Sequence, residues 1–121
     1  MTPSLKGKHI ALLVTDGFEQ VELTGPKEAL EKLGATVDIL SDTIDTVRGW
    51  HHDKPADAFK VSKTFEVARI NDYDAVVLPG AVMNADQIRS IPRAQELVKQ
   101  AAAQEKPIAV ICHGAWLLVS A

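Results

Sequence analysis

The sequence predicts a single α/β domain built on a parallel sheet. Short apolar runs such as "HIALLVT" (9–15) and "DAVVLP" (74–79) are continuous rather than alternating, which is typical of strands buried on both faces. Segments with helical apolar spacing separate these runs, and a strand, a helix and a second strand in that order favour parallel pairing. The 121 residues suffice for one domain with a real core, but not for two.

The first predicted strand, 9–15, is followed by a predicted helix over the segment "FEQVELTGPKEALEKLG" (18–34). Apolar residues recur in this segment at roughly helical spacing, and Gly34 is a good C-terminal cap. Pro26 lacks the N–H that would bond the carbonyl of Glu22, and its ring clashes with that carbonyl. We therefore expect a kink at this point, or two short helices.

A second strand is predicted at 35–41, parallel to the first. The pattern then weakens from 42 to 71, where we expect short strands or a hairpin around Val47 and Phe59. A third strand over 75–78 is stopped by a Pro-Gly pair.

The last part of the chain predicts a helix, a strand and the start of another helix. The helical segment is broken near Pro92 and resumes over 93–106 with an apolar stripe at Leu97, Val98 and Ala101. A fourth strand follows at 107–112, and 114–121 begins a helix that is apolar on nearly every side.

Charge and cysteine content narrow the function classes. Thirteen Lys and Arg against sixteen Asp and Glu give a formal charge of −3 without a basic stripe, which argues against nucleic acid or an anionic membrane as the main partner. The single cysteine cannot form an internal disulfide, and the N-terminus lacks a secretory signal. We expect a cytoplasmic protein that acts on small molecules or protein chains.

Three strand-to-helix turns carry the candidate chemistry, because ligands of open parallel sheets bind at the carboxyl ends of the strands. They are 16–22, 79–86 and 112–114. In the third, Cys112 stands where a strand must bend sharply into a helix, so its thiol would be exposed and its pKa lowered by the helix N-terminus. The alternative is a cysteine that only fills the core. The sequence Cys-His-Gly between strand and helix favours a nucleophile, with the N–H of His113 as an oxyanion donor.

The first turn contributes Glu19 and Glu22, which are three residues apart and so would share one helix face. Two neighbouring carboxyls favour one that keeps its proton and donates a hydrogen bond to the thiolate. Spacing alone favours equally that both are solvated acids at a helix N-terminus. The second turn offers the amides of Gly80 and Ala81 as oxyanion donors and Asp86 as a carboxylate, or simply as a helix cap.

The adjacent pair His51-His52 beside Asp53 invites a metal interpretation, but no ligand spacing supports one. A polar loop is favoured, and His52 remains a secondary candidate for the site, as does Glu19. We expect neither a metal nor a cofactor.

Four motifs, "TDGFEQVEL", "VRGWHHDKPADAF", "DAVVLPGAVMNAD" and "KPIAVICHGAWLLVSA", together resemble the ThiJ/PfpI family of the class I glutamine amidotransferase-like superfamily, from about residue 9 to 121. The resemblance implies a flavodoxin-like three-layer sandwich with a mostly parallel central sheet and a nucleophile elbow. It implies that Cys112 is the nucleophile, His113 its base and Glu22 the carboxyl that hydrogen-bonds the thiol. In the peptidase-like branch an acid from another subunit completes the triad, and the matching residue is Asp86. A homo-oligomer, at least a dimer with a shared active site, is therefore expected.

Two features depart from the family pattern. Ala81 stands where relatives commonly have a second glycine, and its methyl would narrow the oxyanion pocket. The sequence also ends where relatives continue, so we expect a single domain, 1–121, that lacks its C-terminal part and leaves the helix 114–121 uncovered.

The resemblance implies a stress-related cysteine hydrolase of the PfpI type, a peptidase or a glyoxalase or deglycase that acts on carbonyl-modified molecules or peptides. One alternative is a redox sensor or chaperone that uses an oxidisable Cys112. Another is a binding domain in which this cysteine is structural.

Overall fold

The structure, a computed structural model, describes residues 4–80 and 86–110 of the chain. Its centre is a five-stranded sheet in the order β6-β3-β1-β7-β8, in which every neighbouring pair is parallel. The strands in this order are Lys63–Thr64, Thr36–Ser41, His9–Leu13, Ala75–Leu78 and Ile108–Val110. The predicted α/β fold on a mostly parallel sheet is confirmed.

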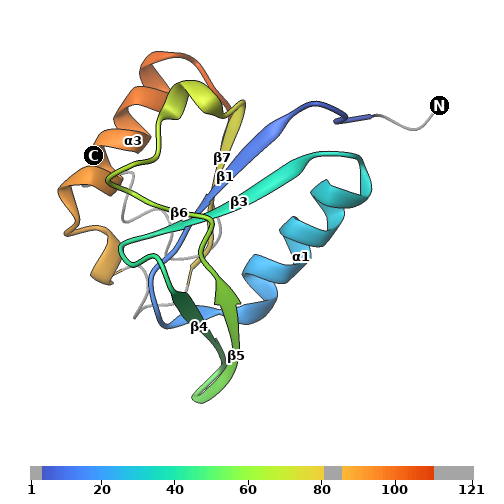
Figure 1. The fold of residues 1–121 in the computed structure, drawn as a ribbon. Helices are drawn as coiled ribbons and strands as arrows, with labels where there is room; N and C mark the ends of the chain where they lie inside the picture. The colour runs from blue at the N-terminus through green and yellow to red at the C-terminus, as the bar shows by residue number, and fades with distance from the viewer. Residues whose placement is uncertain (1–3, 81–85, 111–121) are drawn as a thin grey trace.

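Helices α1 (Gln20–Lys32) and α3 (Pro92–Ala103) lie on opposite sides of this sheet (Figure 1). The chain moves from β1 to β3 in one direction and from β7 to β8 in the other, and right-handed crossovers in opposite directions place their helices on opposite faces. Successive side chains of a strand therefore enter different cores: Leu12 packs on the α1 side and Leu13 on the α3 side. The three-layer sandwich is confirmed.

Helix α1 runs without interruption through Pro26, so the expected division into two short helices is wrong. Proline removes one hydrogen bond of the helix, whereas Leu23 before it and Leu30 after it pack into the same core cluster, which favours one continuous helix. The helix ends before Gly34, whose φ of 103° is the left-handed conformation that suits glycine.

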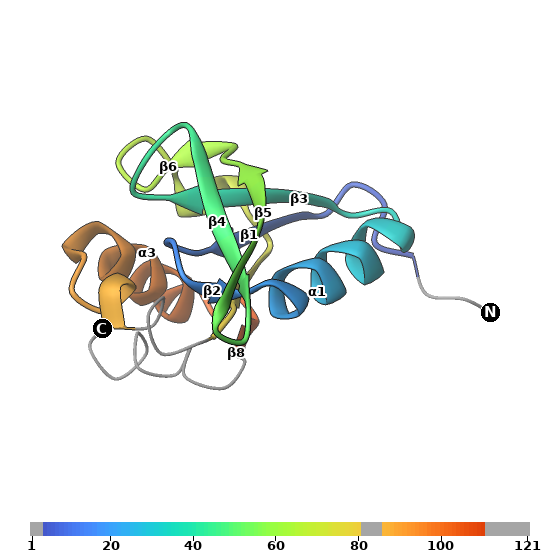
Figure 2. The ribbon, with the colours of Figure 1, turned by 90° about the horizontal axis from the view of Figure 1, so that it is seen from below.

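A second, three-stranded sheet stands beside the first turn. Strand β2 (Phe18–Glu19) pairs in parallel with β4 (Thr46–His51), which forms an antiparallel hairpin with β5 (Lys54–Lys60). Val47 faces Phe59 in this hairpin, so the weakly predicted hairpin is confirmed. In Figure 2 the hairpin passes beside β2 and the start of α1.

Helix α3 begins at Pro92, where a missing N–H costs nothing, and the helical residues 86–88 are separate from it. The predicted stripe of Leu97, Val98 and Ala101 is buried as expected. Strand β8 follows, and the helix predicted at 114–121 lies outside the described residues.

An apolar groove of about 330 Å³ lies between the middle of α1 and the β7–β8 edge. Pro26 and Leu30 line its helix side, and Ala75, Val77 and Ala109 line its sheet side. The described elements thus cover the α1 face of the sheet less completely than the α3 face. Within residues 4–80 and 86–110, no helix has the length and apolar character needed to cross a membrane.

Candidate active site at the carboxyl edge of the sheet

Two of the three predicted turns can be located on neighbouring strands. The turn 16–22 follows β1, and Gly80 follows β7, which pairs directly with β1. Both turns lie at the carboxyl edge of the sheet, where the fold class places its ligands. The expected residues Cys112, His113 and Ala81 lie outside the described part of the chain.

Glu22 joins these two turns. Its Oε1 accepts a hydrogen bond of 2.8 Å from the backbone N–H of Gly80, across 58 residues of sequence, and the side chain is half-buried. This bond occupies the amide that we expected to serve as an oxyanion donor, because the carboxyl in the first turn of α1 is directed at it. The structure therefore supports a role for Glu22 at this edge and does not present the Gly80 amide to a substrate.

Glu19 has a different partner. Its Oε1 and Oε2 accept the backbone N–H of His52 at 2.8 and 3.2 Å. His52 has a φ of 58°, a left-handed conformation unusual for a residue with a side chain, and the bond to Glu19 supports it. The two glutamates thus accept hydrogen bonds from separate segments, so they are not simply two solvated acids at a helix N-terminus.

The same short segment contains two further acceptors that sequence reasoning missed. Asp16 Oδ1 accepts the N–H of Arg48 at 2.7 Å. Gln20 Oε1 accepts the N–H of Asp57 at 2.8 Å, while Gln20 Nε2 donates to Asp57 Oδ2 at 2.9 Å. We name residues 16–22 the acceptor segment. The partners of this segment depend on the register of the hairpin. The apolar pattern of residues 42–71 is too weak to predict that register.

His52 lies at the tip of the hairpin with its side chain 82% exposed. Its Nδ1 is 3.9 Å from Glu19 Oε1, and its ring is tilted against that of His51 with centroids 4.8 Å apart. Among the described residues, no group of three or more His, Cys, Asp or Glu side chains is arranged to hold a metal ion. Asp86 is exposed at the start of the helical residues 86–88.

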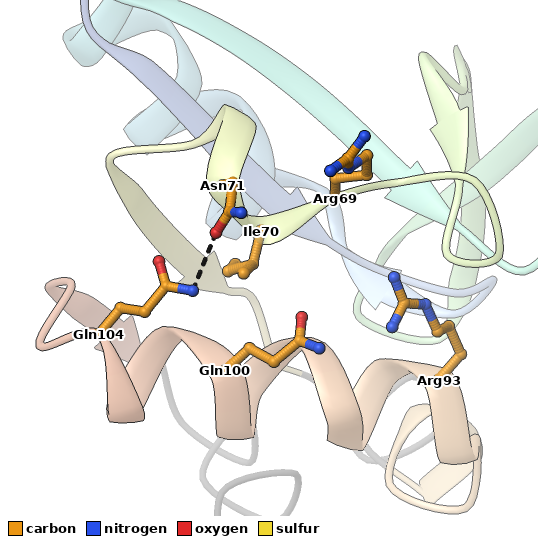
Figure 3. A pocket seen from close by; sticks show the side chains of 6 residues that line it. All are labelled: Arg69, Ile70, Asn71, Arg93, Gln100 and Gln104. Carbon is orange, nitrogen blue, oxygen red and sulfur yellow. Dashed lines mark hydrogen bonds between the residues drawn. The ribbon is translucent and has the colours of Figure 1, made fainter.

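A polar pocket of about 270 Å³ lies elsewhere, between α3 and the short 3-10 helix η1 (Ile70–Asp72) (Figure 3). None of the predicted site residues lines it. Its Arg93 donates to the carbonyls of Phe65 and Ala68 and pairs with Glu96 at 3.0 Å. This guanidinium therefore fastens the loop before η1 to α3, and we assign it a structural role.

With this geometry established, the family can be identified. The family model described as DJ-1/PfpI family matches residues 8–121. The chain belongs to the DJ-1/PfpI family. The resemblance found in the four motifs is thereby confirmed.

Curated relatives in this family agree. A protein of Bacillus subtilis (strain 168) named "Putative cysteine protease YraA" is 34% identical over 113 residues, which are 93% of this chain and 64% of the relative. Deglycase PfpI of Pyrococcus furiosus is 34% identical over 112 residues, with the same coverage. The chain thus spans about 64% of the length of the relatives it matches.

Among solved structures, the fold is similar to that of a two-domain protein from Anabaena variabilis with DJ-1/ThiJ/PfpI-like and ferritin-like domains. The TM-score is 0.86 at 28% identity, over 93% of this chain and 32% of that one. The DJ-1/PfpI fold is therefore present in the described residues.

Proposed function

We propose that the protein is a cysteine-dependent hydrolase of the PfpI type, a stress-related peptidase or deglycase with Cys112 as its nucleophile. The hydrogen bond between Glu22 and Gly80 is the observation that carries this proposal. It holds a half-buried carboxyl at the carboxyl edge of the sheet, and the resemblance to the family implies that this carboxyl hydrogen-bonds the reactive thiol. The names of the relatives, cysteine protease and deglycase, support the reaction class.

The register of the sheet supports the same assignment. Strands β7 and β8 are parallel, with Leu78 opposite Val110. Gly80 and Cys112 each follow these paired residues by two positions. The described pairing thus brings the strand that precedes Cys112 in the sequence next to the strand that precedes Gly80, which supports the choice of Cys112 as the nucleophile that acts with Glu22.

The proposed reaction begins with attack of the Cys112 thiolate on an electrophilic carbonyl carbon. With an amide substrate, His113 first takes the proton of the thiol and then gives it to the departing amine as the carbon–nitrogen bond breaks, which leaves the acyl group on the sulfur as a thioester. Water then hydrolyses the thioester and restores the thiol. Glu22 hydrogen-bonds the sulfur and favours its reactive form, and the N–H of His113 stabilises the developing oxyanion. No metal or cofactor takes part in this proposal.

The test compares the wild type with Cys112→Ser and Glu22→Leu on methylglyoxal, a glycated amino acid and a fluorogenic peptide. We expect turnover of at least one substrate by the wild type, loss with Cys112→Ser and a strong decrease with Glu22→Leu. Glu28→Gln, an exposed change on the same helix, serves as the control and should retain activity.

Two other outcomes would reject the hydrolase. Absence of turnover by the wild type, together with stoichiometric sulfinic acid at Cys112 under mild peroxide, would identify a redox sensor. Alkylation of Cys112 by iodoacetamide no faster than an ordinary thiol would identify a structural cysteine.

We also propose that Asp86 completes the site of a neighbouring subunit in a homo-oligomer. Its exposed position at the end of the second turn supports this role. Mixing Asp86→Ala subunits with Cys112→Ala subunits should restore activity if sites are shared. Failure to restore it, when mass measurements show that mixed oligomers have formed, would rule out the shared site.

A further inference from the structure

In addition to the backbone pairing of β2 with β4, three side chains of the acceptor segment bind the hairpin. Side-chain oxygens of Asp16, Glu19 and Gln20 each accept one backbone N–H of the hairpin, at 2.7 to 2.8 Å. The next acceptor along the chain is Glu22, whose partner is Gly80 instead. The acceptor segment thus binds the hairpin through Asp16, Glu19 and Gln20, and it binds Gly80 in the candidate active site through Glu22.

The contact between Gln20 and Asp57 is reciprocal. The Gln20 amide accepts the backbone N–H of Asp57 through Oε1 and donates to the Asp57 carboxylate through Nε2, at 2.8 and 2.9 Å. Two hydrogen bonds in opposite directions fix the orientation of an amide that a single bond would leave free to rotate, and one of them is charge-assisted. Position and orientation of Gln20 are therefore both determined by the hairpin.

The backbone of the hairpin is adapted to this contact. The pairing of β4 with β5 shifts between Arg48 and Trp50, where Gly49 alone lies opposite two residues of β5, Ala56 and Asp57, so that β5 bulges at this point. A Cβ atom added to Gly49 would lie 3.1 Å from the Cβ of Gln20 and from Cε2 of Phe18. Only glycine leaves room for Gln20 to cross the strand at this distance and reach Asp57.

Helix α1 needs such an external support. Its N-cap residue, Glu19, makes no side-chain capping bond to the helix, because its carboxylate is used by His52. An uncapped first turn leaves its N–H groups without a side-chain acceptor and frays more readily. Gln20 is the first residue of the helix, and Glu22 is two residues further within the same turn.

We infer that Gln20 and Asp57 are positioning residues, which set the reactivity of Cys112 by holding the first turn of α1 and hence the carboxyl of Glu22. This inference rests on the proposed function. We assign neither residue a contact with the reacting atoms. Their effect passes through the helix turn, and displacement of Glu22 weakens its hydrogen bond to the sulfur.

The experiment measures the rate of Cys112 alkylation by iodoacetamide between about pH 5 and 9. Gln20→Met removes both reciprocal bonds without a change of charge, whereas Asp57→Ala removes only the bond from Gln20 Nε2 to the carboxylate and keeps the backbone N–H that donates to Gln20 Oε1. Each should slow alkylation at pH 7 by about three- to tenfold, the range expected for the loss of one or two hydrogen bonds, and should move the pH midpoint upward. Lys27→Met is the matched control, because it removes an exposed pair with Glu31 in the same helix.

A double variant tests the geometry separately from the charge. In Gln20→Glu/Asp57→Asn the donor and acceptor exchange places, so the reciprocal pair can form again with the amide on the hairpin. We expect it to alkylate within about twofold of the wild type, whereas Gln20→Glu alone, with two carboxylates facing each other, should be slow.

The outcomes distinguish this inference from the proposed function. If wild-type Cys112 is no more reactive than a free thiol, the proposed function fails and the inference fails with it. If wild-type Cys112 is reactive but both single variants keep its pH profile, only the positioning role is wrong. Should Gln20→Met not fold, Asp57→Ala and the double variant still decide the question.

Discussion

Side-chain oxygens accept hydrogen bonds at both edges of the central sheet, but these bonds connect different parts of the molecule. At the amino edge, Asp74 accepts the N–H of His9 at 2.8 Å, and the hydroxyl of Tyr73 donates to Asp38 at 2.7 Å. These bonds tie β1 and β3 to the residues that lead into β7, inside the sheet itself. At the carboxyl edge, the acceptors are gathered in one short segment and reach outward to the hairpin and to Gly80.

The comparison separates stability from activity. A bond between neighbouring strands supports the fold wherever it lies, so its loss should lower the free energy of unfolding and leave the chemistry intact. A hydrogen bond that orients the acceptor segment toward the candidate active site should affect activity more than the free energy of unfolding. The substitutions below test this separation at one edge at a time.

Glu22→Gln should have the largest effect on activity. The amide can still accept the Gly80 N–H, so the free energy of unfolding should change little, but an amide N–H is a weaker donor to the sulfur than a protonated carboxyl. We expect turnover to fall about 100-fold, within the range of acid–base contributions. Steady-state kinetics and urea denaturation of the same preparation measure both quantities, and a stability loss as large as the activity loss would contradict the separation.

Gly49→Ala should perturb both the hairpin and the first turn. The new methyl would lie 3.1 Å from the Cβ of Gln20 and from Cε2 of Phe18, so the hairpin must move away from the acceptor segment. We expect a loss of about 1–3 kcal/mol in the free energy of unfolding, as for other overpacked sites. Urea denaturation measures this loss, and a variant as stable as the wild type would show that the close approach is unnecessary.

Tyr73→Phe tests the amino edge. Burial and then the hydrogen bond to Asp38 raise the pKa of Tyr73 above its ordinary value, so the hydroxyl stays protonated and continues to donate. Its removal leaves the half-buried Asp38 carboxylate without this donor and should cost about 1–2 kcal/mol. Alkylation of Cys112 should not change. A slower alkylation would mean that the two edges are coupled.

Asp74→Asn should have the smallest effect, and only at higher pH. The backbone N–H of His9 lowers the pKa of the exposed Asp74 below its ordinary value. The carboxylate therefore contributes stability above its unfolded pKa of about 3.9, and this contribution is lost as the pH falls through the lower folded pKa. The difference in melting temperature between wild type and variant should shrink as the pH is lowered from about 5 to about 2. A difference that is independent of pH would exclude this ionisation.

Apolar runs and helical periodicity predicted the main strands and helices of the central sheet. The third strand, 75–78, was predicted to the residue, because a continuous apolar run ends at a Pro-Gly pair. The apolar stripe of α3 was also correct, since helix periodicity repeats over three turns. Pro26 was read too strongly, because the packing of Leu23 and Leu30 on one core outweighs a single lost hydrogen bond.

The sequence alone determined the α/β class and the family, because short-range periodicity and motifs record these directly, and the resemblance to the family made Glu22 a candidate. It did not reveal that Glu19 and Glu22 have different partners, or that Asp16 and Gln20 hold the hairpin. These contacts join residues 32 to 58 positions apart, and they exist only once the bulge of β5 opposite Gly49 and the order of the strands have brought the segments together. Tertiary structure decided them because a side-chain acceptor has no fixed partner until the fold supplies the N–H that faces it.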